Sequence, residues 1–200
     1  GSCLCEPPLC HAASTPPARM TVFERNRNRD ATNPQPQGPG RRVSVRYRKL
    51  DRTIPQTKWP CRRCKGRGCI ECHETGRQYA NSVEDYVAIP FLAASGATDE
   101  SFHGAGREDI DARTIGTGRP FILELRDPKV RALDLATFPA LVEEVSGGRV
   151  EIDSLRFAPK SEIAAIKEHR GPKTYVAHVK FDAPVDDAKP REVVAATEGR

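Results

Sequence analysis

The sequence contains no stretch approaching the roughly 18 to 20 consecutive apolar residues that a membrane-spanning helix requires. Its first residues, Gly1-Ser2-Cys3-Leu4-Cys5, lack the basic and apolar regions of a secretory signal. Only 38% of the residues are hydrophobic and 30% are charged, which is typical of a soluble protein with flexible parts. No internal repeat is visible. We therefore expect a cytoplasmic protein with one domain, or a small module attached to a core.

Acidic residues are nearly absent between Arg41 and Arg67, where Asp51 is the only one. Basic residues are abundant in the same segment, which holds eleven of them: Arg41, Arg42, Arg46, Arg48, Lys49, Arg52, Lys58, Arg62, Arg63, Lys65 and Arg67. Such a block favours a polyanionic partner, because neutralising phosphates releases counterions. The alternative is a solvated, disordered basic arm. The two interpretations are compatible, since basic arms often become ordered only on nucleic acid.

Residues 1–40 are expected to be disordered, because prolines such as Pro7-Pro8 and those of 33–40 interrupt any periodic pattern. This segment also contains Cys3, Cys5, Cys10 and His11. Their spacing is irregular and no glycines support a metal-binding knuckle, so metal binding there is the less favoured interpretation.

The remaining sequence predicts alternating strands and helices. Alternation predicts a first strand at 43–50. Ser82 is expected to cap a helix that ends by Gly96, and Pro90 could kink or shorten this helix. The later elements are strands at 119–126, 149–157 and 174–181 and helices at 133–146 (ended by Gly147-Gly148) and 160–169. This order predicts an α+β fold, with a mixed or antiparallel sheet and flanking helices. We divide the chain into 1–40, a basic segment with a cysteine module at 41–80, a core at 81–185, and a polar tail at 186–200.

The cysteine module has the spacing C-x2-C-x4-C-x2-C, formed by Cys61, Cys64, Cys69 and Cys72. Two close pairs, with Gly66 and Gly68 between them to let the backbone turn, suit tetrahedral zinc. The basic residues between the pairs favour zinc over an iron–sulfur cluster, although the four-residue gap is tight. Reduced thiols without metal, or His73 in place of one cysteine, are the alternatives. The spacing also resembles the cysteine-rich domain of DnaJ chaperones. We expect a structural metal, because no open coordination position or nearby base is evident.

The segment 103–121 compresses four glycines, three carboxylates and three arginines between two apolar segments. Glycine permits positive φ and the close approach of another backbone or a ligand. Such a loop could present an aspartate as a nucleophile or general base to a bulky anionic substrate. The alternative is a tight turn with surface ion pairs.

Within this loop, Gly106-Arg107-Glu108-Asp109 resembles the G-R-x-D element of pseudouridine synthases. The longer string from Gly104 to Phe121 is similar to the archaeal and eukaryotic tRNA pseudouridine synthase family often called Pus ten, which isomerises T-loop uridines at tRNA positions 54 and 55. The resemblance implies a tRNA partner, no organic cofactor and Asp109 as the nucleophile, with Asp111 as the runner-up. It further implies that Arg107 pairs with Asp109 or occupies the space of the flipped base.

The family also has a basic residue and an aromatic residue on a strand that lines the pocket. Lys173-Thr174-Tyr175 matches this element, which implies that Tyr175 stacks on the uracil and that Lys173 steadies the carboxylate or a phosphate. The alternative for Tyr175 is a core position. Arg113 and Arg119 are further substrate-binding candidates. Glu108 and Arg113 are also expected to hold the loop through ion pairs, and Arg119 to anchor the strand behind it.

The resemblance covers about 43–181. Full family members carry an N-terminal RNA-binding domain of the THUMP kind, and they continue beyond the Lys-x-Tyr strand. We therefore expect a truncated catalytic core, which a second chain or a homodimer could complete. The alternative is a non-catalytic zinc-containing RNA-binding protein, or one piece of a split synthase. Whether the aspartate attacks the sugar or removes a sugar proton stays open.

Overall fold

The computed structural model describes residues 40–169, 171–186 and 188–198. These residues form two units, one that ends at His169 and one that follows it. The disorder expected for residues 1–40, and the possible role of Cys3, Cys5, Cys10 and His11, concern residues that lie outside this range, apart from Gly40. None of the helices in the described residues is long and apolar enough to cross a membrane.

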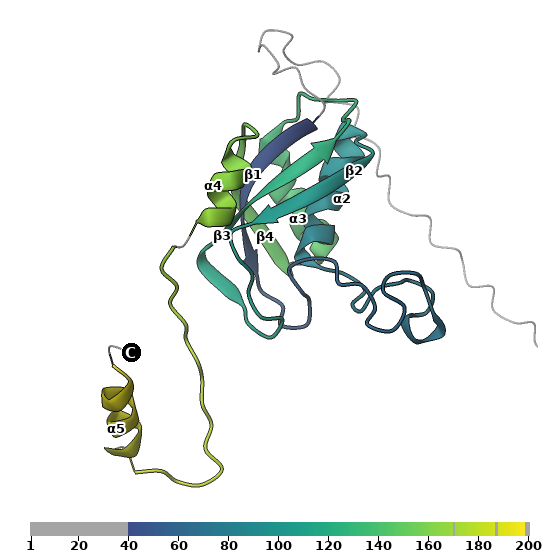
Figure 1. Ribbon diagram of the computed structural model, residues 1–200. Helices are drawn as coiled ribbons and strands as arrows, with labels where there is room; N and C mark the ends of the chain where they lie inside the picture. The colour runs from purple at the N-terminus through teal and green to yellow at the C-terminus, as the bar shows by residue number, and fades with distance from the viewer. Residues whose placement is uncertain (1–39, 170, 187, 199–200) are drawn as a thin grey trace, which may run out of the picture. The chain divides into compact units, whose positions relative to one another are not determined.

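The first unit is built on a four-stranded antiparallel sheet (Figure 1). The strands lie in the order β2-β3-β1-β4, and their bounds are Asp99–Gly104 for β2, Thr114–Arg126 for β3, Gly40–Lys49 for β1 and Val150–Phe157 for β4. The helices α2 (Val83–Ser95) and α3 (Phe138–Ser146) cover one face, and α4 (Glu162–Glu168) contacts β2 and β3. The predicted α+β fold with flanking helices is confirmed.

Alternating side chains make β1 a central strand. Val43, Val45 and Tyr47 are at most 1% exposed, and they pack with apolar residues of β3 and β4 and with the inner faces of α2 and α3. Phe91 and Phe138 join the two helices through stacked rings whose centroids are 3.8 Å apart. The alternative of a disordered basic arm is therefore wrong for β1, the part of the basic block at Gly40–Lys49. The face of β1 that carries Val43, Val45 and Tyr47 belongs to the core, although the other face carries arginines.

The helix ends follow the local sequence signals. The Ser82 hydroxyl accepts a hydrogen bond from the backbone nitrogen of Asp85, at 3.2 Å, and Gly96 ends α2 in the left-handed conformation. Pro90 lies inside α2 and does not shorten it. A 3-10 turn, η3 (Leu135–Thr137), precedes α3, and Gly147 ends that helix in the left-handed conformation.

Two strand predictions differ from the structure. The strand β2 was not predicted, because its six residues, Asp99–Gly104, are mostly polar and pair only along one edge, with β3. The strand predicted at 174–181 is not formed: residues 171–186 contain no strand. Alternation alone does not make a strand, since an extended segment also needs a neighbour for its backbone hydrogen bonds. The second unit contains α5 (Ala188–Thr197), where only a polar tail was expected.

Candidate functional site

Asp109 lies in the loop between β2 and β3, residues 105–113. The backbone nitrogen of Ala105 donates to Pro120 O at 3.2 Å, and that of Ala112 donates to Asp109 O at 3.2 Å, which closes a short turn. Asp109 is exposed. Within the described part of the chain, its carboxylate has no hydrogen bond and no ion pair, so both oxygens remain available to a substrate.

The Lys49 side chain of β1 holds the backbone of this turn. The Lys49 side chain is completely buried, and its Nζ donates to the carbonyl oxygens of Asp109 at 3.1 Å, Ile110 at 2.7 Å and Ile54 at 3.2 Å. Three donors thus meet three acceptors, as a buried ammonium group requires. Burial lowers the pKa of Lys49, although the nearby Glu108 carboxylate opposes that shift. Lys49 therefore fixes the main chain of Asp109 while the carboxylate stays free.

Glu108 faces inward, opposite to Asp109, and its side chain is only 5% exposed. Its Oε2 accepts a hydrogen bond from the Tyr47 hydroxyl at 2.7 Å and forms an ion pair with Arg119 Nε at 3.0 Å. Gln56 Nε2 donates to Tyr47 Oη at 2.7 Å and to Gly106 O at 3.1 Å. Burial, together with the Glu108 charge, raises the pKa of Tyr47 well above its usual range, which keeps the hydroxyl protonated as a donor. The expected ion pair of Glu108 is confirmed.

The three arginines of the segment 103–121 make different contacts. Arg119 supports the loop, since it also donates to Ala105 O at 3.2 Å. Arg113 is exposed and, within the described residues, forms no ion pair; it borders an open hollow with Leu50, Asp51, Arg52, Gly148 and Arg149. Arg107 does not pair with Asp109, and its guanidinium carbon instead lies 5.5 Å from the centre of the Trp59 ring. Of the two roles expected for Arg107, the pairing with Asp109 is therefore not formed in this structure, and a place in the space of the flipped base stays a prediction.

Asp111, the runner-up, is exposed in the same turn. Lys173 and Tyr175 belong to the second unit, where Tyr175 is 80% exposed. The second unit by itself therefore does not bury Tyr175. The strand that was expected to carry Lys173 and Tyr175 is not formed in the described residues, so a pocket wall made by that strand stays a prediction.

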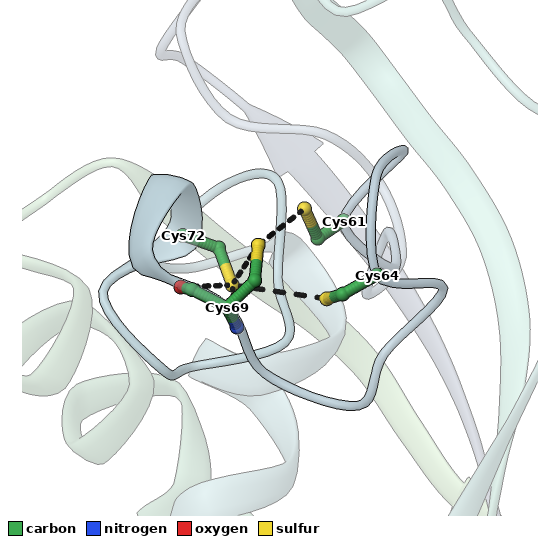
Figure 2. Close-up of side chains that lie close together, drawn as sticks. All are labelled: Cys61, Cys64, Cys69 and Cys72. Carbon is green, nitrogen blue, oxygen red and sulfur yellow. Dashed lines mark hydrogen bonds between the residues drawn. The ribbon is translucent and has the colours of Figure 1, made fainter.

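The four cysteines converge on one point, and Figure 2 shows their sulfurs directed toward one another. The Sγ–Sγ distances are 3.9 Å for Cys61–Cys69, 3.9 Å for Cys64–Cys72 and 3.6 Å for Cys69–Cys72. A tetrahedron of thiolates about zinc, with bonds of about 2.3 Å, has edges of about 3.8 Å. The four-residue gap therefore permits a closed four-thiolate site, and the group fits a metal ion of this kind.

Close backbone contacts shape the cysteine knuckle, which we define as residues 61–76. The Cys61 nitrogen donates to Gly76 O at 2.7 Å. A Cβ on Gly76 would lie 2.3 Å from Gly66 O, so only glycine fits there. The sequence interpretation did not single out Gly76. The short 3-10 turn η2 (Ile70–Cys72) then places the last cysteine.

The environment of Cys72 favours a thiolate. Burial opposes its ionisation, but the backbone nitrogens of Cys69 and Gly76 donate to its sulfur, each at 3.2 Å, and lower the pKa of this thiol to about 6. A thiolate is the form that binds metal. His73 is exposed and is not part of the convergent group, so it does not replace a cysteine in this arrangement.

Four supporting residues of the site were not predicted: Tyr47, Lys49, Gln56 and Trp59. The alternation in 43–50 contained a signal for two of them, because it places Tyr47 and Lys49 on the same face as Val43 and Val45. Nothing in the local sequence indicates the contacts of Gln56 and Trp59.

Comparisons with known proteins show what this chain is similar to. The family model described as "Pus10, C-terminal" matches residues 43–199. The tRNA pseudouridine synthase Pus10 of Methanothrix thermoacetophila is 48% identical over 144 residues, which cover 72% of this chain and 32% of the relative. The proteins of the same name from Methanothermobacter marburgensis and Methanocaldococcus jannaschii are 46% and 47% identical, again over 72% of this chain and over 37% and 32% of their own lengths. The chain thus spans about a third of the length of these curated relatives. It belongs to the Pus10 C-terminal family.

Proposed function

We propose that this chain carries the catalytic aspartate of a tRNA pseudouridine synthase, and that it isomerises a T-loop uridine at tRNA position 54, 55 or both. The observation that carries the proposal is the contrast within one turn. The main chain of Asp109 is fixed by a buried lysine, while its carboxylate is exposed and unpaired among the described residues. The names of the relatives support the same reaction.

The reaction breaks the bond between N1 of uracil and C1′ of ribose, turns the base, and forms a bond between C5 and C1′. The proton on C5 is then lost and N1 gains one, so the product is an isomer and no redox cofactor takes part. The Asp109 carboxylate serves either as the nucleophile at C1′ or as the base that removes a ribose proton. The target nucleotide must first leave the stack, which costs a few kcal/mol that the protein recovers through contacts with the RNA.

Asp109 is favoured over its acidic neighbours on structural grounds. The Glu108 side chain is buried, accepts a hydrogen bond from Tyr47 and forms an ion pair with Arg119, so it cannot reach a substrate without breaking the loop's support. Asp111 is exposed, but its backbone carbonyl does not accept a hydrogen bond from Lys49. A carboxylate that attacks a fixed carbon needs a fixed main chain, because small displacements are costly in rate.

We propose that the basic surface of the knuckle contributes to tRNA binding. Arg62, Lys65 and Arg67 are exposed there, and Arg63 is exposed although it pairs with Glu71. Phosphate contacts of this kind position an RNA without reading its sequence. Lys173 and Tyr175 are proposed as further substrate contacts, with Tyr175 stacking on the uracil.

We also propose that Cys61, Cys64, Cys69 and Cys72 hold zinc as a structural ion. Bound zinc would contribute folding energy and would take no part in the chemical step. Four cysteine ligands would fill the four positions of a tetrahedral zinc site, which would leave no position for a substrate.

The proposal is tested by mapping pseudouridine in a T-arm transcript after incubation with the purified protein. Carbodiimide adducts stop primer extension one nucleotide before each pseudouridine. We expect stops for positions 54 or 55 only. Retained binding of the transcript without any stop would favour the second candidate, a non-catalytic RNA-binding protein or one part of a split enzyme.

A further inference from the structure

Trp59 lies at the neck of the cysteine knuckle, where the chain enters and leaves it. The entering segment pairs with the leaving one through a β-bridge between Pro60 and Arg77, and the nitrogen of Gln78 donates to Trp59 O at 2.9 Å. The next hydrogen bond in this crossing joins Cys61 to Gly76, inside the knuckle itself. The backbone position of Trp59 is therefore set by the same pairing that closes the metal site.

Aromatic contacts orient the Trp59 side chain. The ring of Tyr79 meets it edge to face, with the centroids 5.5 Å apart. The indole nitrogen is buried and has no hydrogen-bond partner in the described residues. Ring contacts rather than a polar anchor thus hold the indole.

The neck is also fixed to the elements that precede the aspartate loop. The backbone nitrogen of Lys58 donates to Glu84 Oε2 of α2 at 2.9 Å, and the Lys58 ammonium group pairs with Glu100 of β2. The strand β2 leads directly into the loop of Asp109. The contact of Lys58 with Glu100 therefore ties the residue before Trp59 to the strand from which that loop begins.

Arg107 connects this neck to the loop. Its guanidinium carbon lies 5.5 Å from the centre of the Trp59 ring, within the range of a cation–π contact. Within the described residues the Arg107 guanidinium forms no hydrogen bond or ion pair besides this contact, and Arg107 precedes Asp109 by two positions. Without it, an exposed arginine would sample many rotamers.

We propose that Trp59 is a positioning residue that holds the Arg107 side chain in place within the loop of Asp109. The cysteine knuckle, whose closing strands position Trp59, thereby supports this loop. The catalytic consequence rests on the proposed function. An arginine that is already ordered can enter the space of the displaced nucleotide without a further loss of side-chain entropy. Metal bound at the knuckle stabilises the neck and thereby the position of Arg107.

Trp59 is the only tryptophan in the chain, so its fluorescence reports this contact directly. We would record the emission of the metal-loaded protein and of the variants Arg107→Ala and Arg113→Ala. Arg113 is an exposed arginine of the same loop that does not lie over the ring, which makes it the matched control. We expect the spectrum to change in Arg107→Ala and after chelation, but not in Arg113→Ala. Identical spectra for the wild type and Arg107→Ala would overturn the proposal.

The catalytic part is tested with Trp59→Phe and Trp59→Leu, which both fill the space but differ in the aromatic face. We expect Trp59→Phe to keep most of kcat and Trp59→Leu to lose about two- to thirty-fold, with metal content unchanged. In an Arg107→Ala background the two variants should have equal kcat. An undiminished difference in that background would contradict positioning through Arg107.

The two proposals fail in distinguishable ways. A wild-type protein that releases no product would contradict the proposed function, and the emission spectra would still decide whether Trp59 holds Arg107. If the enzyme is active but its emission spectrum is the same in Arg107→Ala as in the wild type, the proposed function stands and the positioning role of Trp59 is refuted.

Discussion

At the scale of single residues, the site separates two carboxylates that are adjacent in sequence. Glu108 is buried against Tyr47 and Arg119, whereas Asp109 is exposed and unpaired among the described residues. This arrangement uses one acid to hold the loop and leaves the other free for chemistry. Lys49 completes it, because its buried ammonium group donates to the backbone carbonyl oxygens of Ile54, Asp109 and Ile110.

The role of Lys49 is tested by Lys49→Met. Removing the ammonium group leaves the carbonyl oxygens of Ile54 and Ile110 without this donor and Asp109 O with the Ala112 nitrogen alone, which should lower the free energy of unfolding by about 1–3 kcal/mol. Arg48→Met, on the outer face of the same strand, removes only surface ion pairs to Glu151 and Asp153 and should cost less than about 1 kcal/mol. Urea titrations of both variants provide the measurement. Equal losses would show that Lys49 does not support the turn.

Acid should weaken the cross-strand contact between Arg42 and Glu124. Burial opposes the ionisation of Glu124, but His103 and Arg42 hold the pKa of its carboxyl below the usual value. Because the folded-state pKa is lowered, the stabilisation is fully present above the unfolded-state pKa of about 4.3 and is lost as the pH falls through the folded-state pKa. We expect the wild type to lose more stability than Glu124→Gln between pH 7 and pH 3, by urea titration. A parallel loss in both proteins would contradict this contribution.

At the scale of elements, the knuckle depends on a single close approach of two backbone segments. Gly76→Ala would place a Cβ 2.3 Å from Gly66 O. We expect this variant to lose metal affinity at least about tenfold, since the crossing that brings the cysteine pairs together cannot close. The matched control is Gly148→Ala, which has a similar positive φ but open space around it, and it should keep the affinity of the wild type. Competition with a zinc chelator measures both, and an unaffected Gly76→Ala would refute the steric argument.

Local patterns were sufficient to predict several elements. Alternation in 43–50 predicted β1, and the Ser82 cap with Gly96 predicted both ends of α2. The pattern failed at 174–181, because alternation cannot show whether a neighbouring strand exists to pair with. It also missed β2, whose position is defined by its register with β3 rather than by its own residues.

The candidate site was predicted only in part, again because contacts between residues far apart in the sequence leave no local signal. The spacing of the four cysteines was enough to predict their convergence, and the loop motif singled out Asp109, whose catalytic role stays a prediction. Lys49 was counted within a basic block, although its position on β1 directs it inward. Its contact with Asp109 joins residues 60 positions apart, and such long-range contacts follow from the fold rather than from any local pattern.

At the scale of the whole molecule, the knuckle is a separate small cluster beside the main core. The buried residues of the two clusters do not overlap, and the sheet packs on α2 and α3 without any cysteine. We therefore expect chelation to unfold residues 61–76 while the sheet stays folded. Hydrogen exchange should show lost protection in the knuckle only. Loss of protection throughout β1 and β3 would show that the metal site stabilises the whole unit.

The most direct test of Asp109 as the catalytic residue is tritium release from C5-tritiated uridine in a T-arm transcript, because the C5 proton leaves only when the new bond has formed. Asp111→Asn serves as the matched control, with the same change two positions away in the same turn. We expect release by the wild type and by Asp111→Asn, and none by Asp109→Asn despite retained RNA binding. Undiminished release by Asp109→Asn would contradict the assignment of the catalytic aspartate.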